Sequence, residues 1–304
     1  MIGAINTLTL DMIYSGLSGL PGPGEEVSTG HFHMALGGGP SAALITAARL
    51  GAEARLATCI GTDTLGILAR SFLEQEEISF RDFGPKDGNA LVNVTSVMTF
   101  PREDRSFVSY FSPQRIEEIA GPAVHSYLQD AELVIISGSN ENVIRTLTAN
   151  GARILYDVGW SEGLSLDALR PVLQYVTVFS PNEKEALKMT GAGCAEDALS
   201  ILAGEVEYPI IKLGAMGALI RQNGCTVHVP PAPFVSLDST GAGDAFLGGV
   251  AYGMSRGWDM ERCVRLGNYT GGKATTATGC LTARCSLEEY ETLETQMEQM
   301  ETKL

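Results

Sequence analysis

The chain has 304 residues, of which 44% are hydrophobic and 19% are charged, a composition typical of a globular protein with a sizeable core. Its formal net charge is −15, which argues against nucleic acid or an anionic membrane surface as a partner, because both require clustered Lys and Arg. The six cysteines form no C-x-x-C pair and indicate reduced thiols in a cytoplasmic protein. The first basic residue is Arg49, so no signal peptide is expected.

In chain order, short β-branched runs alternate with helical patterns. Strands are predicted over 54–60, 132–138, 153–158, 176–180, 208–214, 218–222 and 225–229, and helices from about residue 63, over 140–150 and over 181–190. This alternation predicts an α/β fold with a mainly parallel sheet and helices on both of its faces. Residues 27–48 carry no charge, but the run G-G-G-P within them is incompatible with a membrane span.

Two stretches interrupt the alternation, at 12–36 and at about 88–111. Both have the pattern of extended, antiparallel-type strands, so we expect a small second sheet that projects from the main one as a lid. No linker is long enough or rich enough in Pro and Gly to require a separate domain, so 1–304 is predicted to be one domain. From about residue 242 the pattern is almost entirely helical, and S-L-E-E at 286–289 is a capping box for a last helix.

The stretch D-S-T-G-A-G-D-A-F at 238–246 lies where a strand gives way to a helix. Its small residues Gly241, Ala242 and Gly243 leave backbone N–H groups accessible, and a helix that starts there adds its own free donors, so the turn is suited to bind an anion. The simpler alternative is a tight turn in which Asp238, Ser239 or Thr240 caps the helix. The third glycine of a dinucleotide fingerprint is replaced by Phe, and no G-x-x-x-x-G-K loop is present.

Asp244 falls in the first turn of this expected helix. It could simply interact with the helix dipole. It could also accept the proton of a hydroxyl group that attacks a phosphoryl group held by the amides, since phosphoryl transfer needs positioning, charge stabilisation and a base.

The sequence D-S-T-G-A-G-D resembles the D-T-T-G-A-G-D signature of the ribokinase-like (PfkB) carbohydrate kinases in six of seven positions. The resemblance implies a three-layer α/β/α fold with a small β-strand lid. It also implies that Asp244 is the catalytic base and that the amides of Gly241, Ala242 and Gly243 form the anion hole for the transferred phosphate.

Three further segments resemble the nucleotide side of that family. They are N-E-K-E at 182–185, K-L-G-A-M-G at 212–217, and Asn268 on a small-residue helix. The resemblance implies ATP contacts from Asn182, Glu185, Lys212, Gly214, Gly217 and Asn268, with Glu185 reaching Mg²⁺ through water. Two alternatives remain open: a capping box of Ser180 and Glu183 with Pro181 at the first helical position, and a surface role for Lys212.

The substrate side resembles the family less completely. Gly37 and Gly38, followed by Leu50-Gly51, match its first signature and imply backbone contacts to a sugar. The Asp and Asn that normally bind sugar hydroxyls fall at Leu8 and Ala42, which implies altered substrate recognition. Compensation is expected from Asp11, Thr7, Thr9 or His33, with Asp11 the chosen candidate.

Asp238 and Thr240 resemble positions that bind a monovalent cation such as K⁺, with backbone oxygens near 275–279. The predicted activity is ATP-dependent transfer of the γ-phosphate to a hydroxymethyl group of a sugar or sugar derivative, as in ribokinase or fructokinase. The alternatives are a nucleoside kinase of the same family and a non-catalytic sugar-sensing homologue. A homodimer through the lid is expected, because exposed sheet edges tend to be covered.

Overall fold

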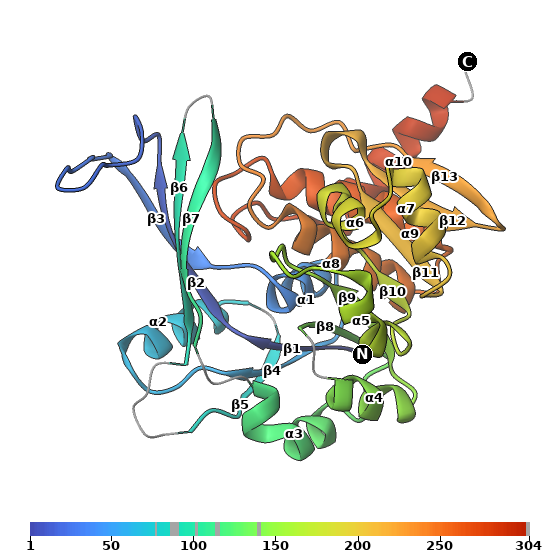
Figure 1. Ribbon diagram of the computed structural model, residues 1–304, viewed down its shortest axis with the longest axis horizontal. Coiled ribbons are helices and arrows are strands. Elements are labelled where there is room, and N and C mark those ends of the chain that lie inside the picture. The colour runs from blue at the N-terminus through green and yellow to red at the C-terminus, as the bar shows by residue number, and fades with distance from the viewer. Residues whose placement is uncertain (77, 86–90, 101–102, 113–115, 139–140, 302–304) are drawn as a thin grey trace.

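A nine-stranded sheet forms the centre of the molecule (Figure 1). The computed structural model describes residues 1–76, 78–85, 91–100, 103–112, 116–138 and 141–301. In spatial order the strands are β13 (Cys225–Val229), β12 (Ala218–Gln222), β11 (Tyr208–Lys212), β10 (Val178–Phe179), β9 (Arg153–Asp157), β8 (Leu133–Ser137), β1 (Ile2–Thr7), β4 (Ala54–Cys59) and β5 (Ser79–Asp82). All neighbours from β11 to β5 pair in parallel, whereas β12 and β13 pair antiparallel. The mainly parallel sheet predicted from the sequence is confirmed.

Helices cover both faces of this sheet (Figure 1). They are α1 (Pro40–Arg49), α2 (Thr64–Leu73), α3 (Ile116–Tyr127), α4 (Glu141–Ala149), α5 (Leu166–Leu173), α6 (Glu183–Thr190), α7 (Ala195–Leu202), α8 (Ala242–Ser255), α9 (Met260–Ala274) and α10 (Leu287–Glu301). Side chains of β8 alternate between the layers: Leu133 and Ile135 pack in the core with α1, α8 and α9, and Val134 and Ile136 pack in the core with α3 to α7. This alternation is what a strand buried on both faces requires.

A close contact between α1 and α8 brings their first turns together. A Cβ atom added at Gly248 of α8 would lie 2.3 Å from the carbonyl oxygen of Ala43 in α1, so only glycine allows the two helices to approach this closely. The first turns of α1 and α8 carry the two glycine-rich motifs of the sequence, and their contact therefore builds the functional site.

A second, four-stranded sheet stands away from the main body as a lid (Figure 1). Its order is β3 (His31–Leu36), β2 (Thr9–Ser15), β6 (Asn93–Phe100) and β7 (Glu103–Tyr110). The predicted small sheet is confirmed, although its first strand starts at Thr9 rather than 12 and its central pair, β2 with β6, is parallel. The parts of the predicted lid at 88–90 and 101–102 lie outside the described residues. Asp11 and Ile13 face the main body, so Met12 and Tyr14 face outward.

The start of α6 differs from the prediction. Its N-cap is Asn182, which forms a reciprocal capping box with Glu185, so the predicted box of Ser180 and Glu183 is wrong. The carbonyl oxygen of Pro181 accepts a hydrogen bond from the amide of Lys212, which holds 180–182 extended beside β11 and delays the helix. The predicted start of α4, Asn140, lies outside the described residues, and α4 begins at Glu141.

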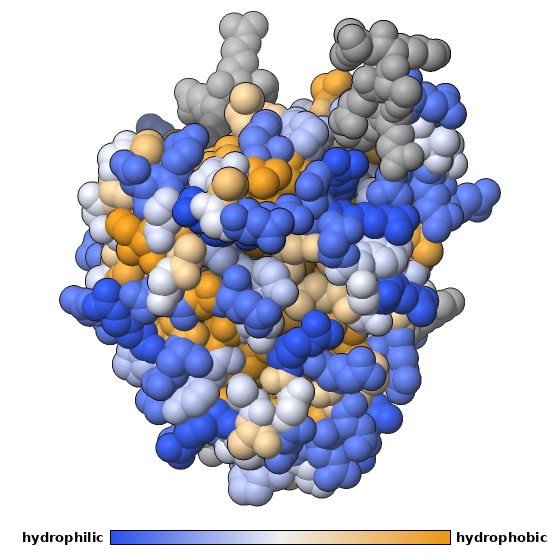
Figure 2. All heavy atoms as spheres, turned by 90° about the vertical axis from the view of Figure 1, so that its right-hand side faces the viewer, coloured by the Kyte–Doolittle hydropathy of each residue, from blue (hydrophilic) through white to orange (hydrophobic). Residues whose placement is uncertain are grey.

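The end of the molecule that carries β13, α7 and α10 is shown in Figure 2. Hydrophilic residues cover most of this end, with apolar residues visible between them, as expected for a chain with a large excess of acidic residues. Within the part of the chain that the structure describes, no helix combines the length and the apolar character needed to cross a membrane.

Candidate active site

The glycine-rich turn before α8 has the conformation that its sequence predicts. Gly241 has a positive φ of 74° and is the N-cap of α8, without a side-chain cap. A Cβ atom there would lie 2.0 Å from Cys280 Sγ, so both the backbone angle and the packing require glycine. The alternative prediction, a helix capped by Asp238, Ser239 or Thr240, is wrong. The Ala242 amide donates a long hydrogen bond to the carbonyl oxygen of Ser239 at 3.3 Å. Since no side chain caps α8, the start of this helix favours an anion through its remaining donors and its dipole.

Lys212 adds positive charge to this turn. A Cβ atom added at Gly243 would lie 3.0 Å from Lys212 Nζ, so the ammonium group lies directly over the turn. The same Nζ lies 3.1 and 3.2 Å from the two carboxylate oxygens of Asp157. Lys212 is thus a partly buried, fixed cation at the helix N-terminus rather than a surface lysine.

Asp244 lies where the first turns of α8 and α1 meet. A Cβ atom at Gly38 would lie 2.2 Å from Asp244 Oδ2, so glycine at this position leaves room for the carboxylate. Burial, and secondly the negative charge of Asp157, raise the pKa of Asp244 from 3.8 to about 6. The group is therefore ionised at neutral pH and is a stronger base than an exposed aspartate.

Asp11 enters the site from the lid strand β2. It is buried, and a Cβ atom at Gly37 would lie 2.6 Å from its Oδ1. Burial, then the charges of Asp244 and Asp238, raise the pKa of Asp11 to about 6. Gly37 and Gly38 therefore allow two carboxylates, those of Asp11 and Asp244, to approach the same backbone turn.

Leu8 and Ala42, the positions at which the family pattern is broken, are completely buried in the core of the α1 side. Asp11, the candidate chosen to compensate for Leu8, lies three residues later and is buried at Gly37. Of the other predicted compensating residues, Thr7 and Thr9 line the cavity described below, and His33 lies 3.5 Å from the position of a Cβ atom at Gly279.

Asp238 and Thr240 join the motif to the segment that follows α9. Asp238 Oδ1 accepts hydrogen bonds from the amide and the hydroxyl of Thr240, and its Oδ2 accepts one from the Gly279 amide at 2.9 Å. The carbonyl oxygen of Thr275 accepts from the amide of Asp238. The segments at 238–240 and 275–279 are thus side by side.

Arg105 of the lid strand β7 also contacts this motif, which was not predicted from the sequence. Its Nη1 lies 3.7 Å from Asp238 Oδ1 and donates a hydrogen bond to Ser239 Oγ. Arg105 belongs to no recognisable motif, and only the pairing of the lid strands brings it to the site.

A pair of carboxylates marks the nucleotide side. Glu185 is buried and accepts a hydrogen bond from the Asn182 amide at 2.8 Å. Burial raises the pKa of Glu185, and the nearby negative charge of Asp157 raises it further. Asp157 was missed by the sequence analysis, although an acidic residue at the carboxyl end of a parallel strand is a usable signal. These oxygens are the ligand type that Mg²⁺ prefers. Among the described residues no group of three or more His, Cys, Asp or Glu forms a complete metal site, so Mg²⁺ would depend on water and phosphate ligands as well.

The remaining predicted ATP residues have clear structural roles. Gly214 and Gly217 bound a short turn and have positive φ angles of 60° and 86°. Asn268 is buried, and its Nδ2 donates to the carbonyl oxygens of Val229 and Pro230 at 3.1 and 2.8 Å. The amide nitrogen of Asn268 therefore fixes the end of β13, and both of these hydrogen bonds go to the protein backbone.

A cavity of about 460 Å³ opens beside Asp244, at the carboxyl ends of β1 and β8. None of its described lining residues is charged. Hydroxyl and amide side chains predominate, with a few apolar ones: the lining consists of Ile5, Asn6, Thr7, Thr9, Gly38, Gly39, Pro40, Asn93, Phe111, Ser112, Ser137, Gly138 and Gly159. The amide nitrogen of Asn6 donates to Ser41 Oγ, which fixes that side chain. Hydroxyl and amide groups beside a carboxylate base suit an alcohol as ligand.

Comparison with known proteins identifies the class to which this site belongs. Residues 1–285 match the model of the pfkB family carbohydrate kinases. The chain therefore belongs to this family, and it is a kinase that transfers phosphate to an alcohol group. The expected class of enzyme is confirmed.

Individual relatives agree with this assignment. Ribokinase of Haemophilus influenzae is 23% identical over 269 residues, which cover 84% of this chain and 86% of that protein. Cytidine kinase of Thermococcus kodakarensis is 41% identical over 104 residues, which cover 33% and 37% of the two chains. A crystal structure from E. coli, assigned as ribokinase II in complex with ATP and Mg²⁺, superposes with a TM-score of 0.82 at 23% identity and covers 97% of this chain and 99% of that one. The ribokinase-like fold is confirmed.

Proposed function

We propose that this kinase transfers the γ-phosphate of ATP to the hydroxymethyl group of an uncharged sugar or sugar derivative. The observation that carries the proposal is the position of Asp244, which lies between the N-terminal donors of α8 and a polar, uncharged cavity. A base is thus adjacent to both the phosphate site and the acceptor site, as in-line transfer requires.

In the proposed reaction Asp244 accepts the proton of the acceptor hydroxyl as its oxygen attacks the γ-phosphorus and the bond to ADP breaks. The amides of 241–243 and the ammonium group of Lys212 stabilise the charge on the transferred group. Glu185 and Asp157 would hold Mg²⁺, Glu185 through water, and the ion would neutralise phosphate charge when bound. Gly214, Gly217 and the wall fixed by Asn268 would hold the nucleotide.

The charge of the site supports a neutral acceptor. Asp11 and Asp244 already lie close together, and each prefers to be protonated more than an exposed aspartate does. A carboxylate or phosphate on the acceptor would add repulsion here, whereas sugar hydroxyls can donate to both carboxylates. The test is an ADP-release screen of neutral sugars against their acidic and phosphorylated counterparts. Preference for an anionic acceptor would contradict the proposal.

A nucleoside is the second candidate, favoured by Phe111. This side chain lines the cavity and is 69% exposed, so it offers an open aromatic face on which a base could stack. The similarity to a cytidine kinase points in the same direction. Phe111→Ala should reduce kcat/KM for a nucleoside about tenfold while leaving that for a free pentose unchanged. Equal effects on both acceptors would argue against base stacking.

A monovalent cation such as K⁺ is proposed to bind near Asp238 and Thr240. The carboxylate of Asp238 and the backbone oxygens near 275–279 lie together behind the anion turn. A cation there would strengthen the positive potential at the turn. Turnover that is unaffected when K⁺ is replaced by Na⁺ or a large organic cation would contradict this site.

A homodimer through the lid is proposed from the outer face of its sheet. Phe32, Val108 and Tyr110 are 53%, 65% and 52% exposed there, and Tyr14 packs against Phe32 with ring centroids 5.2 Å apart. These exposed apolar side chains offer a surface on which two copies of the chain could meet. Val108→Glu should give monomers in sedimentation analysis, and Ile67→Glu on exposed α2 should not. A monomeric wild type would refute the dimer.

The cytoplasm is the proposed place of action. ATP is the expected phosphate donor, and all six cysteines are free thiols in the structure, as is usual in a reducing compartment.

A further inference from the structure

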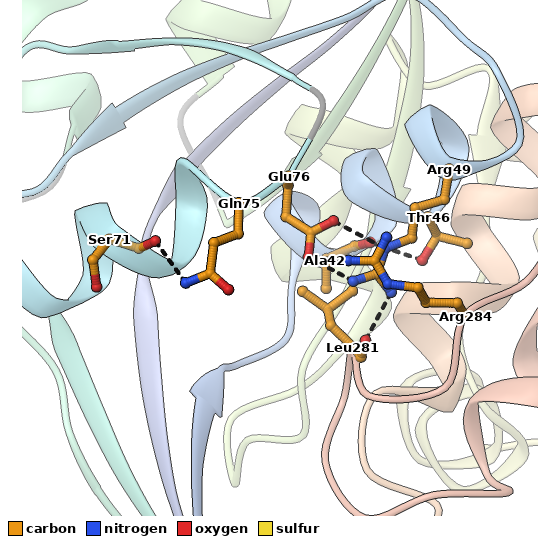
Figure 3. Close-up of polar contacts among 8 residues, drawn as sticks. All are labelled: Ala42, Thr46, Arg49, Ser71, Gln75, Glu76, Leu281 and Arg284. Atoms are coloured by element: carbon orange, nitrogen blue, oxygen red, sulfur yellow. Dashed lines mark hydrogen bonds and ion pairs between the residues drawn. The ribbon is translucent and has the colours of Figure 1, made fainter.

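A buried ion pair lies behind the anion turn and links three separate segments (Figure 3). Arg49, in the last turn of α1, donates from Nε to Glu76 Oε2 at 3.0 Å and from Nη2 to Glu76 Oε1 at 2.6 Å. Its third nitrogen, Nη1, donates to the carbonyl oxygen of Leu281 at 2.7 Å. All three guanidinium nitrogens therefore have defined partners, which a lysine could not match.

The pair is enclosed rather than superficial. The side chains of Arg49 and Glu76 are each only 10% exposed. Glu76 follows α2, whose end is fixed by the side-chain amide of Gln75 donating to the carbonyl oxygen of Ser71 (Figure 3). The exposed Arg284 also approaches Glu76, with its Nη2 3.9 Å from Oε1 (Figure 3). The shorter, buried contact is the bidentate one, and breaking it would leave the Arg49 charge buried without a partner.

The residues next to Leu281 touch both acids of the catalytic motif. The Gly279 amide donates to Asp238 Oδ2. Cys280 Sγ lies 3.9 Å from Asp244 Oδ2 and packs directly against Gly241. Three consecutive residues, 279–281, therefore connect Asp238, Asp244 and the anion turn to the guanidinium group of Arg49.

From this connection we infer that Arg49, fixed by Glu76, is a positioning residue for phosphoryl transfer. Its hydrogen bond to Leu281 holds 279–281 in contact with the D-S-T-G-A-G-D motif, and this contact positions Asp244 and the anion turn. The inference rests on the proposed function for its catalytic consequence, but not for the structural tether itself. Arg49 touches neither substrate nor the reacting atoms. The other end of its own helix α1 also lies at the site, because Gly38, next to the N-cap Gly39, lies against Asp244 Oδ2.

The first test measures the tether without any substrate. Arg49→Met combined with Glu76→Gln removes both charges together, so no unpaired charge stays buried. Iodoacetamide labelling of Cys280 is then followed by mass spectrometry, because trypsin cleavage after Lys273 and Arg284 isolates this cysteine in one peptide. Cys280 is 2% exposed, so its labelling reports local opening of the segment.

We expect Cys280 to react about tenfold faster or more in this double variant, while the fully buried Cys59 of β4 stays protected as a reference for global unfolding. The matched control is Arg262→Met with Glu294→Gln, which removes another bidentate pair, between α9 and α10. The control should leave Cys280 protected. Unchanged labelling of Cys280 in the Arg49 variant would overturn the inference.

The second test measures turnover of the same variants. Loss of positioning should reduce kcat on the order of 10²-fold with little change in KM for ATP, because a small displacement of catalytic groups affects the chemical step most. Faster Cys280 labelling with an unchanged kcat would overturn the positioning role and leave a structural tether. A wild-type enzyme that phosphorylates no acceptor would refute the proposed function instead, while the labelling result would still decide whether Arg49 holds the segment.

Discussion

Replacing Asp244 with Asn removes the proposed base while keeping the size of the side chain. Asn has nearly the same shape as Asp, and its amide oxygen can still accept a hydrogen bond, so the turn should keep its geometry. Without a base at this position, kcat should fall about 10²–10⁴-fold. Binding of ATP should change little, because Lys212 and the nucleotide side are not altered.

The same substitution should stabilise the protein at alkaline pH. The pKa of Asp244 is raised from 3.8 to about 6, so its contribution to folding is fully present below pH 3.8 and is lost as the pH rises through about 6. At pH 8 the buried charge therefore destabilises the native state by about 3 kcal/mol. Removing it should raise Tm at pH 8 by roughly 5–10 °C, with little change near pH 4.

Thermal unfolding at the two pH values and steady-state kinetics check both effects. Asp259→Asn is the control, because it makes the same charge change at the exposed N-cap of α9, where Asn also caps well. A variant at Asp244 with near-normal kcat would refute its role as base. A variant with unchanged Tm at pH 8 would refute the reasoning about its burial and charge.

Three further predictions concern the same site. The kcat of the wild type should fall tenfold per pH unit below about 6 and be level above it, because Asp244 must be ionised to accept a proton; a level profile from pH 5 to 8 would contradict this. Lys212→Met should reduce kcat on the order of 10²-fold and raise KM for ATP, as measured by steady-state kinetics at varied ATP concentration. Unchanged kcat and KM would refute the role of Lys212 at the phosphate. Gly38→Ala should reduce kcat with little change in Tm, because its methyl group would lie 2.2 Å from Asp244 Oδ2 and the carboxylate must move; unchanged kcat would show that this contact is not needed.

The elements and the catalytic motif could be predicted because their signals are local. Alternating β-branched and helical patterns determine the sheet and its helices, and the small residues before Asp244 specify the turn before α8. The predicted start of α6 was wrong because a tertiary contact determines where this helix begins. The amide of Lys212 in β11 donates a hydrogen bond to the carbonyl oxygen of Pro181, which keeps the chain extended for longer than the local pattern suggests.

The rest of the site depends on contacts between distant segments. Asp11 was chosen from the sequence only as one of four candidates near Leu8, because its place beside Gly37 depends on how β2 pairs within the lid. Asp157 and Arg105 lie on strands whose positions within their sheets cannot be predicted from the sequence pattern alone. No spacing rule connects them to the motif they contact.

The most direct test of the account is a ³¹P NMR experiment with ATP, Mg²⁺ and a panel of neutral sugars and nucleosides. The account predicts a new phosphate monoester on a hydroxymethyl group, formed in equal amount with ADP by the wild type and not by Asp244→Asn. ADP formed without a phosphorylated acceptor, or the same monoester formed at the same rate by Asp244→Asn, would contradict it.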